Sequence, residues 1–340
     1  MHSKHIALIH TGGTIGMEKT ARGYAPMPDF ARRLSGALGD MASAGIVLPR
    51  HTLHEFIHPI DSANSTPADW QKIARELATL YAAHDGFVVL HGTDTMAYTA
   101  TALSFMLQGL RKPVILTGAQ RPLGEPDSDA LSNLTAALRL AASDSINEVA
   151  IFFNRRLLRG NRSSKRSAQD VDAFESPNYP SLAEVGTAIE LHVPALLPRL
   201  ALEKFELPNY EAGKILSLQL TPGMPVAALE ALLALQPRAL ILECYGAGNA
   251  PDQDAALLNA LNRATASGVV LIACSQVPHG RVALGTYATG TALARTGAIG
   301  ALDMTFEAIF VKLHHLFALG LRPDAVRTEL LRDWCGELTV

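Results

Sequence analysis

The sequence predicts an α/β protein with a larger N-terminal domain, built on a parallel sheet, and a smaller C-terminal α/β domain. Three observations support this prediction. The chain has 340 residues, which is long for one hydrophobic core. Short apolar runs alternate with stretches of helical length over most of the chain. This alternation lapses near residue 200, where prolines are frequent. We therefore predict domains at 1–190 and 214–340, joined by a linker at 191–213.

The start of the chain places small and polar residues directly after a predicted strand. Residues 5–10 are mostly apolar and predict the strand, which Thr11-Gly12-Gly13-Thr14-Ile15-Gly16 follows. Residues 16–28 are rich in Gly, Thr, Ala and Pro, which predicts a mobile loop over a site. A short amphipathic helix is expected at 29–38.

The next stretch leads from an extended piece into a capped helix. Residues 51–60 predict a strand, and Asp61-Ser62 closes it. In Thr66-Pro67-Ala68-Asp69 the threonine can cap a helix, proline is tolerated at the first helical position, and the aspartate can complete a capping box. We therefore expect a helix that runs to about residue 83.

A second strand that ends in a polar turn follows at the centre of the predicted sheet. Phe87-Val88-Val89-Leu90 is a continuous apolar run, typical of a strand buried on both faces. Gly92 turns the chain, Thr93-Asp94-Thr95 come next, and a helical pattern then runs to Gly109. Parallel strands deliver such turns to one edge of a sheet, where ligands bind. We therefore expect the two glycine–threonine turns to face one another.

The remaining elements continue the βα alternation of a parallel sheet. A loop is expected at 118–127, and residues 155–169 are polar and basic. We expect strands at 113–117, 148–153, 214–220, 239–244 and 269–274, and helices at 128–142, 226–235, 252–266, 305–319 and 323–334.

Two segments, Leu8–Gly16 and Gly86–Met96, resemble the paired signatures of the bacterial-type L-asparaginases, specifically the cytoplasmic (type I) enzymes. Each signature alone is moderately specific, and their order and spacing make the pair strongly so. The resemblance covers essentially the whole chain and extends to Asp61-Ser62, Arg159–Lys165, Tyr245–Asn249 and Gly285–Gly290.

The resemblance implies roles for five catalytic residues. Thr14 would attack the side-chain amide carbonyl of L-asparagine, and Tyr24, on the loop over the substrate, would bond to and orient Thr14. Thr93, Lys165 and Asp94 would form a hydroxyl–base–carboxylate set that activates the nucleophile or the water. A lysine acts as a base only if its pKa falls from ~10.4 toward about 7 or 8. Flanking arginines would lower this pKa, whereas Asp94 would raise it.

The resemblance also implies how the substrate is held. Asp61 and Ser62 would bind its α-amino and α-carboxylate groups, with Asp94 near the ammonium and Thr93 in the same substrate-binding set. Backbone N–H groups at the Gly92-Thr93 turn would stabilise the oxyanion. The resemblance implies no metal and no organic cofactor, and assembly as a homodimer or homotetramer.

The segment His54-Glu55-Phe56-Ile57-His58 matches the H-E-x-x-H pattern of zinc proteases. That pattern works on a helix, where both histidines share one face with the glutamate beside them. Pro59 follows, and the surroundings show no helical periodicity. On a strand, Glu55 would point to the opposite face from the two histidines, so we favour a strand without zinc.

Two further patterns have alternative interpretations. The Gly12–Gly16 turn could cradle a phosphate, but a dinucleotide fingerprint needs G-x-G-x-x-G at the start of a helix. The basic run from Arg155 to Arg166 could contact nucleic acid, but it holds no aromatic residue for stacking. We favour a solvated or interface segment for this run, with Lys165 singled out for chemistry.

Composition bounds the remaining possibilities. The net charge of −3 gives no overall attraction to nucleic acid or to an anionic membrane surface, and no apolar run reaches the length of a membrane span. The first residues do not form a secretory signal, so we expect a cytoplasmic protein. The three cysteines, Cys244, Cys274 and Cys335, lack C-x-x-C spacing, which argues against a disulfide framework or a zinc ribbon.

Two rival functions stay open at this point. An asparaginase-like subunit of a tRNA-dependent amidotransferase would pass ammonia to a partner. Such subunits usually carry an additional N-terminal domain, whereas the first signature here begins by residue 8. A non-enzymatic amino-acid-binding protein would need the carboxylates that hold the substrate, but neither Lys165 nor the pair of hydroxyls.

Overall fold

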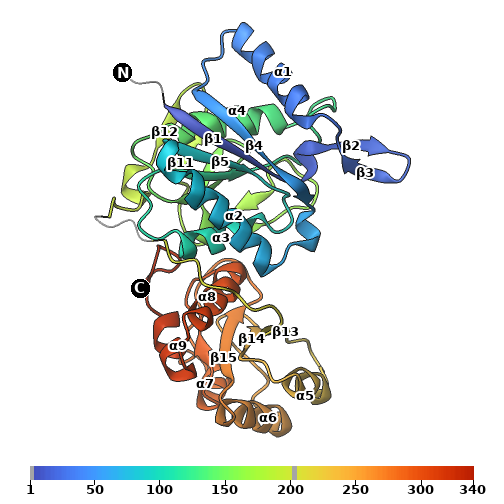
Figure 1. Ribbon diagram of the computed structural model, residues 1–340. Helices are drawn as coiled ribbons and strands as arrows, with labels where there is room; N and C mark the ends of the chain where they lie inside the picture. The colour runs from blue at the N-terminus through green and yellow to red at the C-terminus, as the bar shows by residue number, and fades with distance from the viewer. Residues whose placement is uncertain (1–3, 201–204) are drawn as a thin grey trace. The chain divides into compact units, whose positions relative to one another are not determined.

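The structure is a computed structural model that describes residues 4–200 and 205–340 (Figure 1). The chain folds into two compact units, Met1–Leu207 and Pro208–Val340. The predicted linker, 191–213, spans this boundary. Its residues 201–204, and residues 1–3 of the predicted N-terminal domain, lie outside the described residues. Each unit has its own sheet, and the predicted α/β fold class, with a larger N-terminal and a smaller C-terminal domain, is confirmed.

The N-terminal unit is built on an eight-stranded sheet with the order β12-β11-β8-β7-β6-β5-β1-β4. The parallel part of the sheet contains β7, β6, β5, β1 and β4. The remaining pairs, β7 with β8, β8 with β11 and β11 with β12, are antiparallel. The strands are β1 (His5–Gly12), β4 (Arg50–Ile60), β5 (Gly86–Leu90), β6 (Val114–Thr117), β7 (Val149–Phe153), β8 (Arg156–Arg159), β11 (Ala183–Val185) and β12 (Ile189–Leu191).

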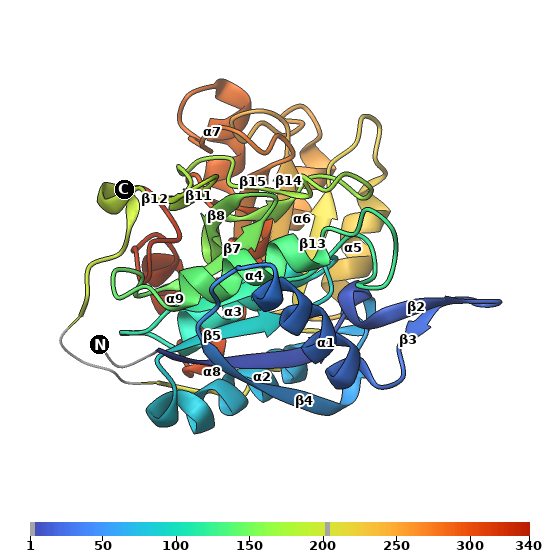
Figure 2. The ribbon, with the colours of Figure 1, turned by 90° about the horizontal axis from the view of Figure 1, so that it is seen from above.

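Helices cover both faces of this sheet, and Figures 1 and 2 show α2 and α4 on opposite sides of it. Ile6 and Leu8 of β1 and Val88 of β5 form one core with α1 and α4. The i, i+2 spacing of Ile6 and Leu8 places them on one face of the sheet. The helices are α1 (Phe30–Ser43), α2 (Pro67–Leu80), α3 (Met96–Met106) and α4 (Ala130–Ala141).

The carboxyl ends of four adjacent parallel strands lie along one edge of the sheet. In register, Gly12 of β1 pairs with Ile60 of β4, and His10 pairs with Leu90 of β5. Leu90 in turn pairs with Thr117 of β6. Each strand is followed by a polar turn, so side chains that are far apart in sequence are delivered to one place.

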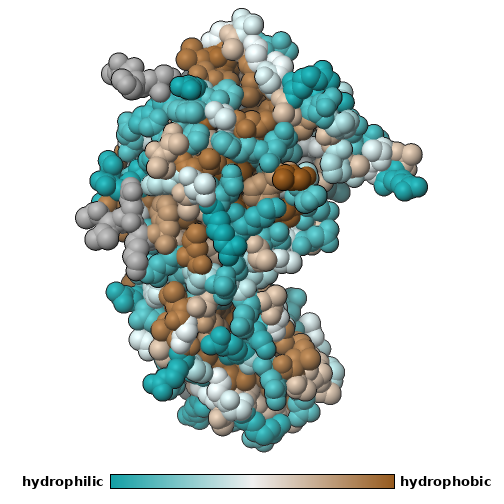
Figure 3. Space-filling model, viewed as in Figure 1, coloured by the Kyte–Doolittle hydropathy of each residue, from teal (hydrophilic) through white to brown (hydrophobic). Residues whose placement is uncertain are grey.

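The segment that follows β1 differs from the predicted mobile loop, because it forms a hairpin. Strands β2 (Met17–Thr20) and β3 (Gly23–Pro26) pair antiparallel, and Figures 1 and 2 show the hairpin projecting beyond the sheet. Elsewhere, the connection from α1 to β4 exposes Ile46 and Val47, and Figure 3 shows apolar surface beside α1.

Other boundaries also shift from the prediction. Helix α1 continues to Ser43, beyond its last buried residue, Leu38, so the apolar pattern in the sequence ends before the helix does. In the proline-rich stretch, β11 pairs with β8 and β12 pairs with β11. Helix α7 (Ala288–Arg295) was not predicted, because its glycine and threonines mask the helical pattern. Two short strands, β9 (Ser164–Lys165) and β10 (Phe174–Glu175), form a separate pair.

The C-terminal unit has a parallel sheet with the order β13-β14-β15-β16. Apolar cores lie on both faces, one against α8 and α9 and one against α5 and α6. The elements are β13 (Ile215–Gln219), α5 (Val226–Ala234), β14 (Ala239–Cys244), α6 (Ala255–Ala266), β15 (Val270–Ser275), α7 (Ala288–Arg295), β16 (Ile299–Gly300), α8 (Phe306–Ala318) and α9 (Pro323–Leu330).

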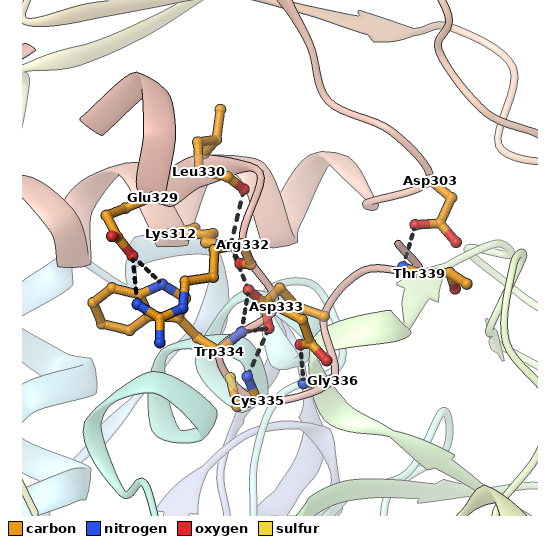
Figure 4. Close-up of polar contacts among 11 residues, drawn as sticks. Asp303, Lys312, Glu329, Leu330, Arg332, Asp333, Trp334, Cys335, Gly336 and Thr339 are labelled. Carbon is orange, nitrogen blue, oxygen red and sulfur yellow. Dashed lines mark hydrogen bonds and ion pairs between the residues drawn. The ribbon is translucent and has the colours of Figure 1, made fainter. Parts of the chain in front are cut away.

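A buried ion pair ties the end of the chain to α8 (Figure 4). Lys312 and Glu337 contact each other with both side chains fully buried. Lys312 Nζ also donates to the Leu330 carbonyl at 2.9 Å. The Glu337 carboxylate accepts the backbone N–H groups of Trp334 and Cys335, at 3.1 and 2.8 Å. These hydrogen bonds offset part of the cost of burying the two charges.

Candidate active site

The turn after β1 packs directly against the turn after β5. A Cβ placed on Gly13, whose φ is +93°, would lie 2.4 Å from the backbone nitrogen of Gly92. A Cβ placed on Gly92 would lie 2.3 Å from Ser62 Oγ. Both positions therefore require glycine. The turns after β1, β4 and β5 therefore meet in direct contact.

Lys165 meets Thr93 and Asp94 at this edge. Its Nζ lies 2.9 Å from Thr93 Oγ1 and 2.6 Å from Asp94 Oδ1, although 71 or more residues separate it from them in sequence. Thr93 is buried, whereas Asp94 is exposed. The structure thus brings together the hydroxyl, the amine and the carboxylate that the resemblance grouped.

The backbone that leads to Lys165 is held by buried arginines. Arg159 donates from Nε to Glu148 at 2.7 Å, and both side chains are almost fully buried. The guanidinium carbons of Arg159 and Arg162 lie 4.3 and 5.2 Å from the Tyr179 ring centroid. The expectation of a solvated or interface segment is therefore wrong for Arg159 and Arg162. Glu148 and Tyr179, which are distant in sequence, supply the counter-charge and the ring.

Thr14 begins a 3-10 turn, Thr14–Gly16, and is half-buried. Within the residues that the structure describes, its hydroxyl makes no hydrogen bond. Beneath the turn lies His10, because a Cβ on Gly16 would come within 2.6 Å of His10 Nε2. Burial lowers the pKa of His10, although Glu55, 3.3 Å from Nδ1, opposes this shift.

Tyr24 lies on β3 of the projecting hairpin, and its side chain is 51% exposed. Its hydroxyl donates to Glu125 Oε1 at 2.7 Å, whereas the resemblance implied a bond to Thr14. The hydrogen bond to Glu125 raises the pKa of Tyr24. In this structure the Tyr24 hydroxyl is therefore occupied by Glu125.

Asp61 and Ser62 follow β4. The Asp61 carboxylate is exposed and accepts the N–H of Ala63 at 3.1 Å. The Ser62 side chain is buried against Gly92, and its carbonyl accepts the Thr95 hydroxyl at 2.8 Å. Asp61 therefore presents a carboxylate beside the glycine turns, and Ser62 fixes the geometry between them.

Two residues at this site were not predicted from the sequence. Gln120 Oε1 lies 3.4 Å from Thr93 Oγ1, and its amide donates to the Asp170 carbonyl at 3.0 Å. His91 is buried behind the turn and bonds to the Gly92 carbonyl at 2.7 Å. The signal for Gln120 was available, because it follows a strand that ends at the same edge as β5.

The H-E-x-x-H pattern lies on β4, as predicted, and not on a helix. Within residues 4–200 and 205–340, no group of three His, Cys, Asp or Glu side chains is arranged to hold a metal ion. No helix in these ranges has both the length and the apolar character that crossing a membrane requires.

The fold and the site define a two-domain α/β protein with hydroxyl, amine and carboxylate groups gathered at the carboxyl edge of a parallel sheet. The family model "Asparaginase, N-terminal" matches residues 5–196, and "Glutaminase/Asparaginase C-terminal domain" matches residues 214–330. The chain belongs to the asparaginase family.

Individual relatives cover the whole chain. It is 44% identical to L-asparaginase 1 of Escherichia coli (strain K12), over 100% of this chain and 99% of that one. The crystal structure of L-asparaginase I from Vibrio cholerae matches with a TM-score of 0.89 and 41% identity, over 99% of this chain and 100% of that one. A glutamyl-tRNA(Gln) amidotransferase subunit of Pyrococcus horikoshii is 34% identical, over 99% of this chain and 77% of that protein.

Proposed function

We propose that this chain hydrolyses L-asparagine to L-aspartate and ammonia, with Thr14 as the nucleophile and an acyl-threonine intermediate. Membership of the asparaginase family supports the reaction class. The observation that carries the proposal is the position of Lys165 Nζ, 2.9 Å from the Thr93 hydroxyl and 2.6 Å from the Asp94 carboxylate. A binding protein needs no amine of this kind beside a hydroxyl.

The proposed reaction has two steps. Thr14 Oγ attacks the amide carbon, its proton passes to a base, and the amide nitrogen takes a proton and leaves as ammonia. Water then attacks the ester, so that L-aspartate is released and Thr14 regains its proton. Lys165 donates a hydrogen bond to Thr93 in the present arrangement. It can accept a proton only when its amine is neutral. The Thr93 hydroxyl then relays the proton from the attacking group to Lys165.

Substrate recognition follows from charge. Asp61 follows β4 and Asp94 follows the Gly92 turn, and both have exposed carboxylates, which suit an α-ammonium group. The buried Ser62 and the Thr93 hydroxyl are proposed to bind the α-carboxylate. Helix α3 begins at Met96, and the positive end of its dipole favours an anionic group at this place.

Tyr24 is proposed to act from the hairpin. If Tyr24 orients Thr14, the Tyr24 hydroxyl must leave Glu125 and bond to Thr14 when the substrate is bound. The projecting position of the hairpin is compatible with such a movement. We further propose a cytoplasmic homodimer or homotetramer, and sedimentation velocity of the purified chain measures the size of the assembly.

The test is ammonia release by the purified chain alone. L-Asparagine, L-glutamine and D-asparagine are supplied separately, with and without a metal chelator, and ammonia and aspartate are measured. We expect equal amounts of ammonia and L-aspartate from L-asparagine, with the chelator having no effect. Binding of L-asparagine by calorimetry without ammonia release would support the binding protein instead.

A role as the ammonia-producing part of a tRNA-dependent amidotransferase is the second candidate, favoured by the 34% identity to the Pyrococcus horikoshii protein. It predicts slow ammonia release by the chain alone and acceleration by a tRNA-dependent partner. Full turnover of free L-asparagine without any partner would rule it out.

A further inference from the structure

His91 lies directly behind the Gly92-Thr93 turn, and the steps proposed above do not use it. Its side chain is only 1% exposed. One ring nitrogen, Nδ1, lies 2.7 Å from the carbonyl oxygen of Gly92. The other, Nε2, lies 3.0 Å from the hydroxyl of Thr99 on α3. Both nitrogens are therefore satisfied, and neither points into open space.

These two partners determine where the imidazole carries its proton. The Gly92 carbonyl only accepts hydrogen bonds, so Nδ1 must be the donor. Nε2 then accepts, and the Thr99 hydroxyl donates to it. Burial lowers the pKa of His91, although the bond to Gly92 and the charge of Asp69 oppose this shift. The ring is therefore neutral, with its single proton on Nδ1.

The bond to Gly92 also sets the orientation of the next N–H group. No peptide bond in the described residues is cis, so the Gly92 carbonyl and the Thr93 N–H point in opposite directions. With the carbonyl held on the buried imidazole, the Thr93 N–H points away from His91. Within the described residues this N–H has no hydrogen-bond partner. It belongs to the residue whose hydroxyl contacts Lys165.

We propose that His91 is a positioning residue that aims the Thr93 N–H at the oxygen of the substrate amide as negative charge develops on it. The inference rests on the proposed amide hydrolysis and deepens it. An N–H fixed in advance stabilises an oxyanion more than one that must reorient during the reaction. A histidine that only fills space behind the turn would not stabilise the transition state more than the bound substrate.

The test compares three substitutions at one position. In His91→Asn, the amide nitrogen can occupy the place of Nδ1 and still donate to Gly92. In His91→Gln, the amide nitrogen reaches instead toward the place of Nε2 and Thr99. His91→Leu retains apolar volume and donates to neither. We measure kcat and KM for L-asparagine, the melting temperature, and the affinities for L-aspartate and for the aldehyde analogue of asparagine. The hydroxyl of the nucleophile adds to the aldehyde to give a hemiacetal, and the hydroxyl oxygen formed from the aldehyde occupies the place of the oxyanion.

We expect kcat to fall in His91→Leu and His91→Gln toward the roughly 10²–10³-fold loss that removal of one oxyanion donor causes. KM and the affinity for L-aspartate should change little, and aldehyde affinity should fall in parallel with kcat. His91→Asn should keep kcat within about tenfold of the unsubstituted protein, because it retains the donor. Thr99→Val should lower kcat less than His91→Leu, because Gly92 still selects the Nδ1 proton.

Two results would overturn the inference. If His91→Asn and His91→Gln lose the same activity, the Nδ1 donor has no special role. If every variant loses kcat only in proportion to its melting temperature, His91 serves stability alone. These failures differ from failure of the proposed function, in which the unsubstituted chain releases no ammonia from L-asparagine. The Asn and Gln pair also decides the matter if His91→Leu does not fold.

Discussion

The Nζ atom of Lys165 lies 2.9 Å from the Thr93 hydroxyl oxygen, although the two residues are 72 positions apart. Lys165 is on β9, which pairs with β10, and Thr93 follows β5 at the edge of the main sheet. Asp94 accepts a second hydrogen bond from the same amine. In this geometry the Lys165 amine can exchange a proton with the Thr93 hydroxyl, and the Asp94 carboxylate holds the amine in place.

Lys165→Met removes the amine and retains most of the side-chain volume. We expect kcat for L-asparagine to fall by about 10²–10⁴-fold, the usual effect of losing a general base, with a small change in melting temperature. Lys165→Arg is the matched variant, because arginine keeps the charge beside Asp94 but does not lose its proton at neutral pH. It should be as inactive as Lys165→Met. An active Lys165→Arg enzyme would show that charge, and not proton transfer, is the role of Lys165.

Gly13→Ala tests the contact between the two turns. The new Cβ would lie 2.4 Å from Gly92 N at a φ of +93°. We expect a loss of more than about 3 kcal/mol of unfolding free energy, or a displaced turn without activity. Gly23→Ala is the control, because its φ is +103° but no atom lies within 4 Å of the added Cβ. It should cost only the backbone strain, about 1–2 kcal/mol. Equal costs would mean that the turns are not in contact.

The positions of the parallel strands were largely predictable from sequence, whereas the antiparallel strands and several partners of the site residues were not. Apolar runs such as Phe87–Leu90 predict buried strands, and the turns after them share an edge because the strands are parallel. Tyr24 and Glu125 are 101 residues apart, and no local pattern indicates their hydrogen bond. Likewise, Arg162 belongs to a basic run that looks solvated, and only the tertiary fold provides the Tyr179 ring and the Asn178 carbonyl that bury it.

Lys312→Met should destabilise the C-terminal unit strongly. It leaves the Glu337 carboxylate buried without its cation, which typically costs about 3–5 kcal/mol. The double variant Lys312→Met/Glu337→Gln has no charge at either position and retains an amide oxygen for the N–H groups of Trp334 and Cys335. It should recover part of the loss in urea unfolding. A double variant less stable than Lys312→Met alone would contradict the assignment of the cost to an unpaired charge.

The stability of the C-terminal unit should fall in acid because of His314. Burial lowers the pKa of His314 from 6.5 to about 4, so this histidine binds a proton at a lower pH in the native state than in the unfolded state. The contribution is complete above pH 6.5 and is lost as the pH falls toward 4. At about 1.36 kcal/mol per pH unit, the loss amounts to about 3 kcal/mol.

Thermal unfolding of His314→Gln should depend less steeply on pH in this window than that of the unsubstituted protein. His58→Gln, at an exposed side chain of β4, is the control. If the two variants give identical curves, His314 does not cause the acid sensitivity.

The role of Thr14 is tested most directly by ammonia release from L-asparagine by Thr14→Ala, compared with Thr14→Ser and the unsubstituted chain under saturating substrate. We expect Thr14→Ala to lose at least about 10³-fold in the rate of ammonia release, because the nucleophilic oxygen is gone, and to retain its melting temperature and its affinity for L-aspartate. Thr14→Ser keeps an oxygen and should retain measurable turnover. A folded Thr14→Ala protein that releases ammonia within about tenfold of the unsubstituted rate would contradict the assignment of Thr14 as the nucleophile.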